Sequence, residues 1–195
     1  MDEVVLDGEF FSILERIDEQ IAANVAQGRC THCGGPLHRG DYPRKPRGGL
    51  LGIGGEAFTK RFSFCCGQEG CRRRATPPSV RFLGRRVYVG AVVVLASVFA
   101  LVLHAAGALR RATGIAPRTT RRWAVWWRGP FVGTRMFIAL SGRVVPAVSR
   151  LELPRSLLEK FEGEFCTQLR SLLVQMGPLT TDSIADCAGL LRNIA

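Results

Sequence analysis

Histidine is scarce in this chain. Its 195 residues include three histidines, and all of them lie far along the sequence from Cys166 and Cys187. No nucleophile–base pair is therefore evident, since a catalytic cysteine needs a base close to it. A phosphate-binding loop is missing as well, because no Gly-Lys-Ser/Thr follows the glycine-rich segment 48–55. These absences argue against nucleophilic catalysis and against a P-loop nucleotide site.

An apolar signal peptide is also missing from the acidic first residues, so we expect a cytoplasmic protein. The length allows one or two small domains, and the 47% of hydrophobic residues is enough for a core.

Acidic residues are rare in the middle of the chain. Residues 29–150 hold 22 basic and three acidic side chains, a net charge of +19, whereas residues 1–28 carry −6 and residues 151–195 carry −2. A basic middle between acidic ends suggests a polyanionic partner. Most of these cations are arginines, which make bidentate contacts with phosphate or guanine. A high-GC genome would explain the choice of arginine over lysine, but not its clustering.

Two close groups of cysteines stand out in this basic region. The first reads Cys30-Thr-His-Cys33-Gly-Gly, and the second reads Cys65-Cys66-Gly-Gln-Glu-Gly-Cys71. A structural zinc ion takes four such ligands, and two cysteines a few residues apart supply two of them from one turn. We therefore predict a zinc site formed by Cys30, Cys33, Cys66 and Cys71. Since the segment has few apolar residues, zinc binding and folding should be one event.

The spacing leaves alternatives open at this site. The second pair is wide, and Cys65 could take the place of Cys66. His32 or His38 could replace a cysteine. Without metal, the group would be four unligated thiols, or two disulfides in a secreted domain. Catalytic zinc is disfavoured, because four cysteine ligands leave no open position for water.

Two stretches have the periodicity of amphipathic helices. In residues 9–26 one face is apolar, and Glu15, Asp18 and Glu19 fall elsewhere. Residues 159–173 also carry an apolar stripe, so their acids are assigned to a solvated face. We expect the C-terminal helices to pack within the molecule or to form a homodimer.

Basic residues flank the predicted zinc turns. Residues 60–66 alternate and are aromatic, like a strand that leads into the second turn. The arginines after that turn would lie beside the zinc and grip phosphate, unless they are a solvated charge run. A basic arm with two prolines, residues 39–47, follows the first turn. The predicted DNA contacts of this region are Lys45, Arg47, Arg72, Arg73 and Arg74.

Residues 105–127 have the pattern of a helix-turn-helix. Gly114 can adopt the positive φ of the turn, Ile115 can enter the core, and Pro117 suits the first turn of the second helix. Tryptophans at positions 123, 126 and 127 share the inner face of that helix. A basic helix on a protein or membrane surface is the alternative. In the DNA-binding interpretation, the residues that reach base edges are Arg118, Thr119, Arg121 and Arg122.

Residues 87–109 form a long uncharged stretch, in which His104 is the one clearly polar side chain. Its length and apolarity fit a transmembrane helix, and the alternative function is a single-span membrane protein with a cytosolic zinc ribbon. Arginines flank both ends, which gives no inside–outside asymmetry. The stretch is also rich in small residues, and it could instead form buried helices broken near His104 or Gly107.

The order of these features resembles the N-terminal zinc-ribbon and helix-turn-helix module of bacterial insertion-sequence transposases. Cys-x-x-Cys, a basic insert, an aromatic strand and the second cysteine pair precede Arg72-Arg-Arg-Ala-Thr-Pro-Pro-Ser-Val80, an apolar helix and Thr113-Gly-Ile-Ala-Pro-Arg-Thr-Thr-Arg-Arg-Trp123. The resemblance covers residues 29–128. It implies binding of transposon-end DNA, the four cysteines as ligands, residues 118–122 as the reading face and residues 87–103 as buried core. This chain departs from the pattern in its wide second cysteine pair, its glycine insert and Ala116, where a serine cap is common.

We therefore expect a mainly α protein with a small β zinc ribbon and a helix-turn-helix core with flanking amphipathic helices. The expected parts are an N-terminal amphipathic helix (1–28), the zinc ribbon (29–80), the helix-turn-helix (81–130) and a C-terminal helical region (131–195). The 67 residues after Arg128 show no strand-borne acidic triad, so we expect no enzyme activity. The expected function is zinc-dependent binding of double-stranded DNA, transposase-related or transcription-regulatory, and a separate transposase is a candidate partner. Under this hypothesis, the ribbon positions a neighbouring helix so that it enters the DNA grooves.

Overall fold

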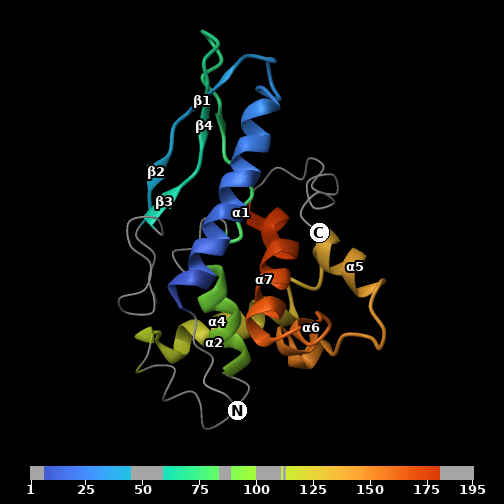
Figure 1. Ribbon diagram of the computed structural model, residues 1–195. Helices are drawn as coiled ribbons and strands as arrows, with labels where there is room; N and C mark the ends of the chain where they lie inside the picture. Colours follow the sequence, from blue (N-terminus) through green and yellow to red (C-terminus); the bar gives the residue numbers. More distant parts are fainter. Residues whose placement is uncertain (1–6, 45–58, 84–88, 100–110, 112, 181–195) are drawn as a thin grey trace.

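The computed structural model describes residues 7–44, 59–83, 89–99, 111 and 113–180. Helices predominate over a few short antiparallel strands (Figure 1), which confirms the predicted combination of mainly α structure with a small β part. The helices are α1 (Gly8–Gln27), α2 (Gly90–Phe99), α4 (Pro117–Arg128), α5 (Arg135–Ser141), α6 (Arg155–Leu158) and α7 (Phe165–Met176), with short 3-10 helices η2 (Arg150–Glu152) and η3 (Gly177–Thr180). The strands are β1 (Leu37–Arg39), β2 (Tyr42–Pro43), β3 (Lys60–Arg61), β4 (Phe64–Cys66) and β5 (Arg74–Ala75).

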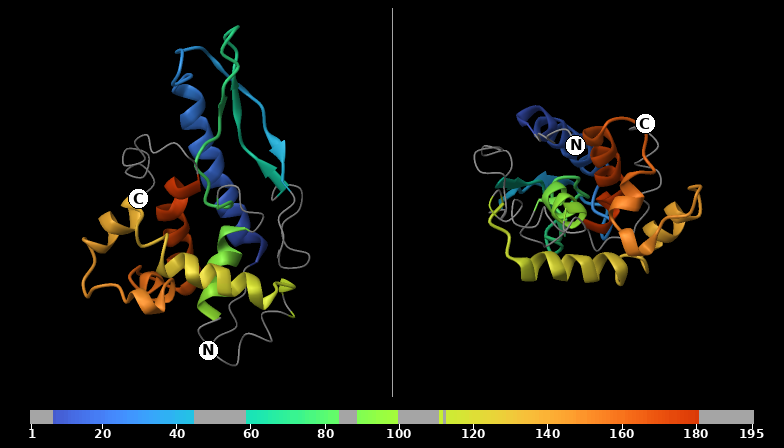
Figure 2. Two further views of the ribbon diagram at one scale, coloured as in Figure 1. Left: turned by 180° about the vertical axis from the view of Figure 1, so that it is seen from behind. Right: turned by 90° about the horizontal axis from the view of Figure 1, so that it is seen from below.

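Helix α1 runs along the long direction of the molecule (Figures 1 and 2). Asp7 caps its N-terminus, because the carboxylate accepts a hydrogen bond from Phe10 N at 2.9 Å. Gly28 ends it. The helix predicted over residues 9–26 is therefore confirmed, and it extends one residue further at each end.

Two hydrophobic cores share α1. Near its N-terminus, Phe10 and Leu14 belong to a large core built with the other helices, which we call the helical core. Near its C-terminus, Ala22 packs with Phe62 and Phe64 in a small core beneath the strands, which we call the ribbon core. One helix thus supports two structural units, and the helical core extends along it as far as Ile21, next to Ala22 of the ribbon core.

The strands form two small antiparallel sheets, and β1 contacts α1. One sheet has the order β1-β4-β5 and pairs Leu37 with Cys66 and Phe64 with Ala75. The other pairs β2 with β3. The strand predicted over residues 60–66 is present as β3 and β4, with a break between them. Strands this short are not stable alone, so the ribbon depends on α1 and on its cysteine cluster.

Helix α2 lies within the apolar stretch 87–109. All residues from Gly90 to Ser97 are buried, and the helix contacts α4 and α7. A Cβ added to Gly90 would lie 3.1 Å from a methyl group of Leu173, so α7 packs closely on the start of α2. Within the described ranges, no helix combines the length and the apolar character that a membrane span requires. His104 lies outside the described residues.

Tryptophans anchor α4 to the helical core. Trp123 and Trp127 are buried, and Trp127 Nε1 donates a hydrogen bond to Ser97 Oγ on α2 at 2.9 Å. Trp126 is half-buried, and its ring centroid lies 5.2 Å from that of Phe131. The face predicted to be the inner one is the buried face, with Trp126 at its edge. Since α4 is held by large rings and a buried hydrogen bond, its outer face has a fixed orientation.

Helix α7 confirms the amphipathic pattern at the C-terminal end. Leu169 and Leu173 are buried in the helical core. Glu159, Glu162 and Glu164, just before the helix, are exposed as predicted. Because the helix begins at Phe165 rather than at residue 159, these acids lie in the turn before it and not on its solvated face.

A buried charge network joins the two cores and corrects one prediction. The sequence pattern places Asp18 off the apolar face of α1, but the residue is 1% exposed. Its carboxylate accepts hydrogen bonds from Ser79 Oγ at 2.5 Å, Val80 N at 2.7 Å and Arg81 Nε at 2.8 Å. Arg81 also donates to Lys60 O of β3 at 3.2 Å. The segment entering the helical core brings these donors against the middle of α1, where a buried carboxylate satisfies them.

Candidate metal centre and basic surfaces

The four predicted cysteines meet at one end of the molecule. Their Sγ atoms all lie within 4.8 Å of one another, with Cys30 and Cys71 at 3.9 Å and Cys33 and Cys66 at 3.4 Å. Ligands about 2.3 Å from a tetrahedral ion are roughly 3.8 Å apart, so the cluster has the size of a metal site. A disulfide would need sulfurs about 2 Å apart. The cysteines of the described residues are free thiols.

The register of β4 decides between the adjacent cysteines. Successive strand residues point to opposite faces, so one of Cys65 and Cys66 can face the cluster. Cys66 does so, whereas Cys65 Sγ lies 3.2 Å from where a Cβ on Gly40 would stand. His32 and His38 are exposed and lie outside the group of four. The geometry therefore favours an all-cysteine set among the described residues.

Two turns with glycines hold the sulfurs. In the first turn Cys30 N donates to Gly35 O at 2.9 Å, and Gly34 N donates to Cys30 O at 2.8 Å. Gly34 has a φ of +71°. A Cβ on Gly35 would lie 3.0 Å from Cys66 Sγ, so this position needs glycine for close approach. In the second turn Gly70 has a φ of +79°. The glycines thus allow the two turns to face each other with little space between them.

The surroundings of the thiols shift their pKa values in different directions. Hydrogen bonds from the backbone amides of His32 and Cys33 lower the pKa of Cys30 to about 7. The Gly35 amide lowers the pKa of Cys33, but the neighbouring thiols, that of Cys66 first, together with burial raise it to about 12. Burial raises the pKa of Cys66. A cation at the centre would have to displace the protons of the last two thiols, which couples metal binding to pH.

The basic residues beside the cluster differ in the contacts of their side chains. Arg72 and Arg73 are exposed. Arg74 Nη1 instead donates to Gly40 O at 2.9 Å and Ser63 Oγ at 3.0 Å, so this guanidinium already ties β5 to the rest of the ribbon. Lys45 and Arg47 lie outside the described residues.

The turn before α4 has the predicted features. Gly114 has a φ of +65°, and Ile115 is buried in the helical core. Pro117 occupies the first turn, and Ala116 provides no side-chain cap. The preceding helix of the predicted pair falls largely outside the described residues.

The outer face of α4 is strongly basic. Arg118, Arg121 and Arg122 are exposed, and Thr119 is half-buried. Trp123 and Trp127 occupy the opposite, buried face. The helix therefore presents three guanidinium groups on a rigid support.

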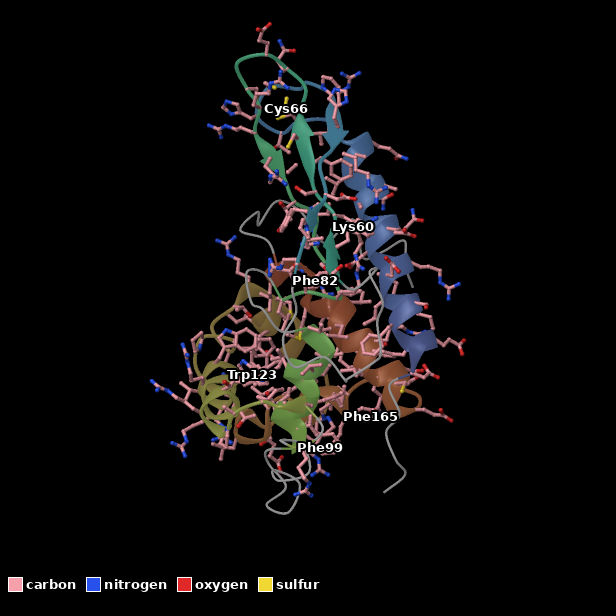
Figure 3. All side chains as sticks on the ribbon, turned by 90° about the vertical axis from the view of Figure 1, so that its left-hand side faces the viewer. Lys60, Cys66, Phe82, Phe99, Trp123 and Phe165 are labelled. Atoms are coloured by element: carbon pink, nitrogen blue, oxygen red, sulfur yellow. The ribbon has the colours of Figure 1, made fainter. Side chains whose placement is uncertain are left out.

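The two basic surfaces lie at opposite ends of the molecule, which corrects the expectation that they are neighbours. Figure 3 shows Cys66 at one end and Trp123 toward the other, with α1 running between these levels. The ribbon packs on the C-terminal part of α1 through the ribbon core, whereas α4 packs on α2 in the helical core. The 20 residues of α1 rise about 30 Å, which sets the scale of the separation.

The network of Asp18 and Arg81 is a structural group that the sequence-based predictions do not include. Its signal was present, because Asp18 follows Leu14 by four residues and precedes Ile21 by three. An acid within the apolar stripe of a helix indicates a buried partner of opposite charge.

No protein-family model matches the chain, and neither the curated proteins nor the solved structures contain a match.

Proposed function

We propose that this chain is a zinc-dependent protein that binds double-stranded DNA and has no catalytic role of its own. The observation that carries the proposal is the outer face of α4, where Arg118, Arg121 and Arg122 are exposed and the opposite face is fixed by Trp123 and Trp127. A helix that enters a major groove needs this division, with cations and polar groups outward and large apolar anchors inward.

Charge supports a nucleic-acid partner over an acidic protein. Residues 29–150 carry a net charge of +19, and the basic groups recur on both the ribbon and α4. A polyanion with regularly spaced phosphates can contact both surfaces at once. The cysteine cluster has the size and the ligand type of a structural zinc site.

The biological role we propose follows from the resemblance to transposase modules. The chain would bind transposon ends beside a separate transposase, or regulate transcription. Its C-terminal helices would serve as a homodimer surface.

Duplex binding by a zinc-loaded preparation tests the proposal. Affinity is measured over a range of salt concentrations for the wild-type protein and for the double variant Arg121→Ala, Arg122→Ala. The variant should bind at least roughly tenfold more weakly, with a salt slope shallower by up to about 2. A matched control is Arg16→Ala with Arg150→Ala, which removes two exposed arginines elsewhere. Equal affinity of the α4 variant and the wild-type protein would refute the role of α4.

A further inference from the structure

The ribbon and α4 are held at a fixed spacing by α1. Leu14, in the N-terminal half of α1, is fully buried in the helical core, and Ala22, in its C-terminal half, is buried in the ribbon core. Between them, Asp18 binds Arg81, which also donates to Lys60 O of the ribbon. These buried contacts support both basic surfaces on the same helix and set the separation between them.

The ribbon strands and α4 lie on the same side of α1. Figures 2 and 3 show both elements on one side of this helix, and its buried residues, Phe10, Leu14 and Ala22 among them, pack in the cores to which the two elements belong. The exposed acids of α1, Glu9 and Glu19, belong to its solvent face. The side shared by the ribbon and α4 therefore faces away from the exposed acids, which suits a polyanion.

The direction of α4 also fits a duplex that runs along α1. Figures 1 and 2 show that α4 runs across the direction of α1, so it would cross such a duplex and could follow a groove. Figure 3 shows α4 further from α1 than the ribbon strands are. A major groove is about 8.5 Å deep, so a protruding helix can enter it while the ribbon stays at the phosphates.

We propose that a single DNA duplex lies alongside α1, with α4 in a major groove and Arg72 and Arg73 on phosphates about one helical turn away. This inference rests on the proposed function and adds a site length to it. The rise of α1, about 30 Å, is close to the 34–36 Å of one turn of B-DNA. Lys60 is exposed and lies between the two ends (Figure 3), where it would contact an intermediate phosphate.

The test compares duplex lengths. The zinc-loaded wild-type protein and the variant Arg72→Gln, Arg73→Gln are titrated against duplexes of about 8 and about 20 base pairs, which are shorter and longer than one turn plus the flanking contacts. On the long duplex the variant should bind roughly tenfold more weakly, with a salt slope shallower by up to about 2. On the short duplex, which cannot reach the ribbon from α4, the two proteins should bind alike. Lys60→Gln should show a smaller loss on the long duplex.

Controls separate this inference from the proposed function. Arg16→Gln, on the solvent face of α1, should bind both lengths like the wild-type protein. Unchanged zinc stoichiometry and circular dichroism show that the ribbon variants are folded. A wild-type to variant ratio that is the same at both lengths overturns the inference and leaves the role of α4 intact. Failure of the wild-type protein to bind any duplex overturns the proposed function and this inference with it.

Discussion

Removing the carboxylate of Asp18 should strongly destabilise the protein. The side chain accepts three hydrogen bonds of 2.5, 2.7 and 2.8 Å from buried donors. Asp18→Ala would leave the Arg81 guanidinium, 0% exposed, beside Glu15 at 3.3 Å as its carboxylate partner in the described part of the chain. Breaking a buried ion pair from one side costs about 3–5 kcal/mol. Since the free energy of unfolding of a domain is about 5–15 kcal/mol, this change should remove a large share of it.

Urea unfolding with excess zinc, followed by circular dichroism, measures the effect. Glu19→Ala is the matched control, because Glu19 is exposed one position along the same helix, and it should change the free energy of unfolding by less than about 0.5 kcal/mol. The double variant Asp18→Leu, Arg81→Met replaces both charges with apolar groups and should recover part of the loss. If Asp18→Ala stayed within about 1 kcal/mol of the wild-type protein, the network would not be the link between the two cores.

Three further predictions concern the metal centre and the helical core. Gly35→Ala should weaken zinc binding at least about tenfold in a chelator competition, because its Cβ would lie 3.0 Å from Cys66 Sγ. Gly67→Ala is the control. Its Cβ meets the end of an exposed histidine side chain, so this variant should bind zinc normally. Equal effects of the two substitutions would contradict the crowding at Gly35. Trp127→Phe removes the hydrogen bond to Ser97 and part of a buried ring, so the free energy of unfolding should fall by about 1–3 kcal/mol. An unchanged midpoint of urea unfolding would count against Trp127 as an anchor of α4. Zinc affinity should rise about tenfold or more per pH unit from mildly acidic to neutral pH, because thiols with a raised pKa hold protons that the ion must displace. A zinc affinity that did not change with pH in the same competition assay would argue against thiolate ligands.

The cysteine cluster could be predicted because each half of it is local. A Cys-x-x-Cys turn or a short glycine-rich loop brings two sulfurs together whatever the rest of the chain does. The choice between Cys65 and Cys66 could not be made in this way. It depends on which face of β4 points inward, and that is fixed by the pairing of Leu37 with Cys66 across the sheet.

The positions of these helices could also be predicted from the sequence, but not all of their buried residues could. The apolar periods of α1, α4 and α7 stand out in the sequence, and the buried faces agree with them. A charged residue on an amphipathic helix is expected to be exposed, but Asp18 is buried. A carboxylate is stable inside a protein when a partner such as Arg81, 63 residues away, compensates it, and a local pattern contains no information about that partner.

The division of α1 between two cores decides what a metal ion can stabilise. The ribbon core is small, and the cysteine cluster closes its far end, so the free energy of metal binding acts on the ribbon. In the described part of the chain, the helical core, which holds Trp123 and Trp127, includes no residue of the strands. Chelation should therefore unfold the ribbon and displace Arg72 and Arg73, while α4 keeps its support and most of the helical circular dichroism is retained. If zinc removal instead abolished the helical signal together with the ribbon, the two cores would fold as one cooperative unit, and the metal ion would stabilise both of them.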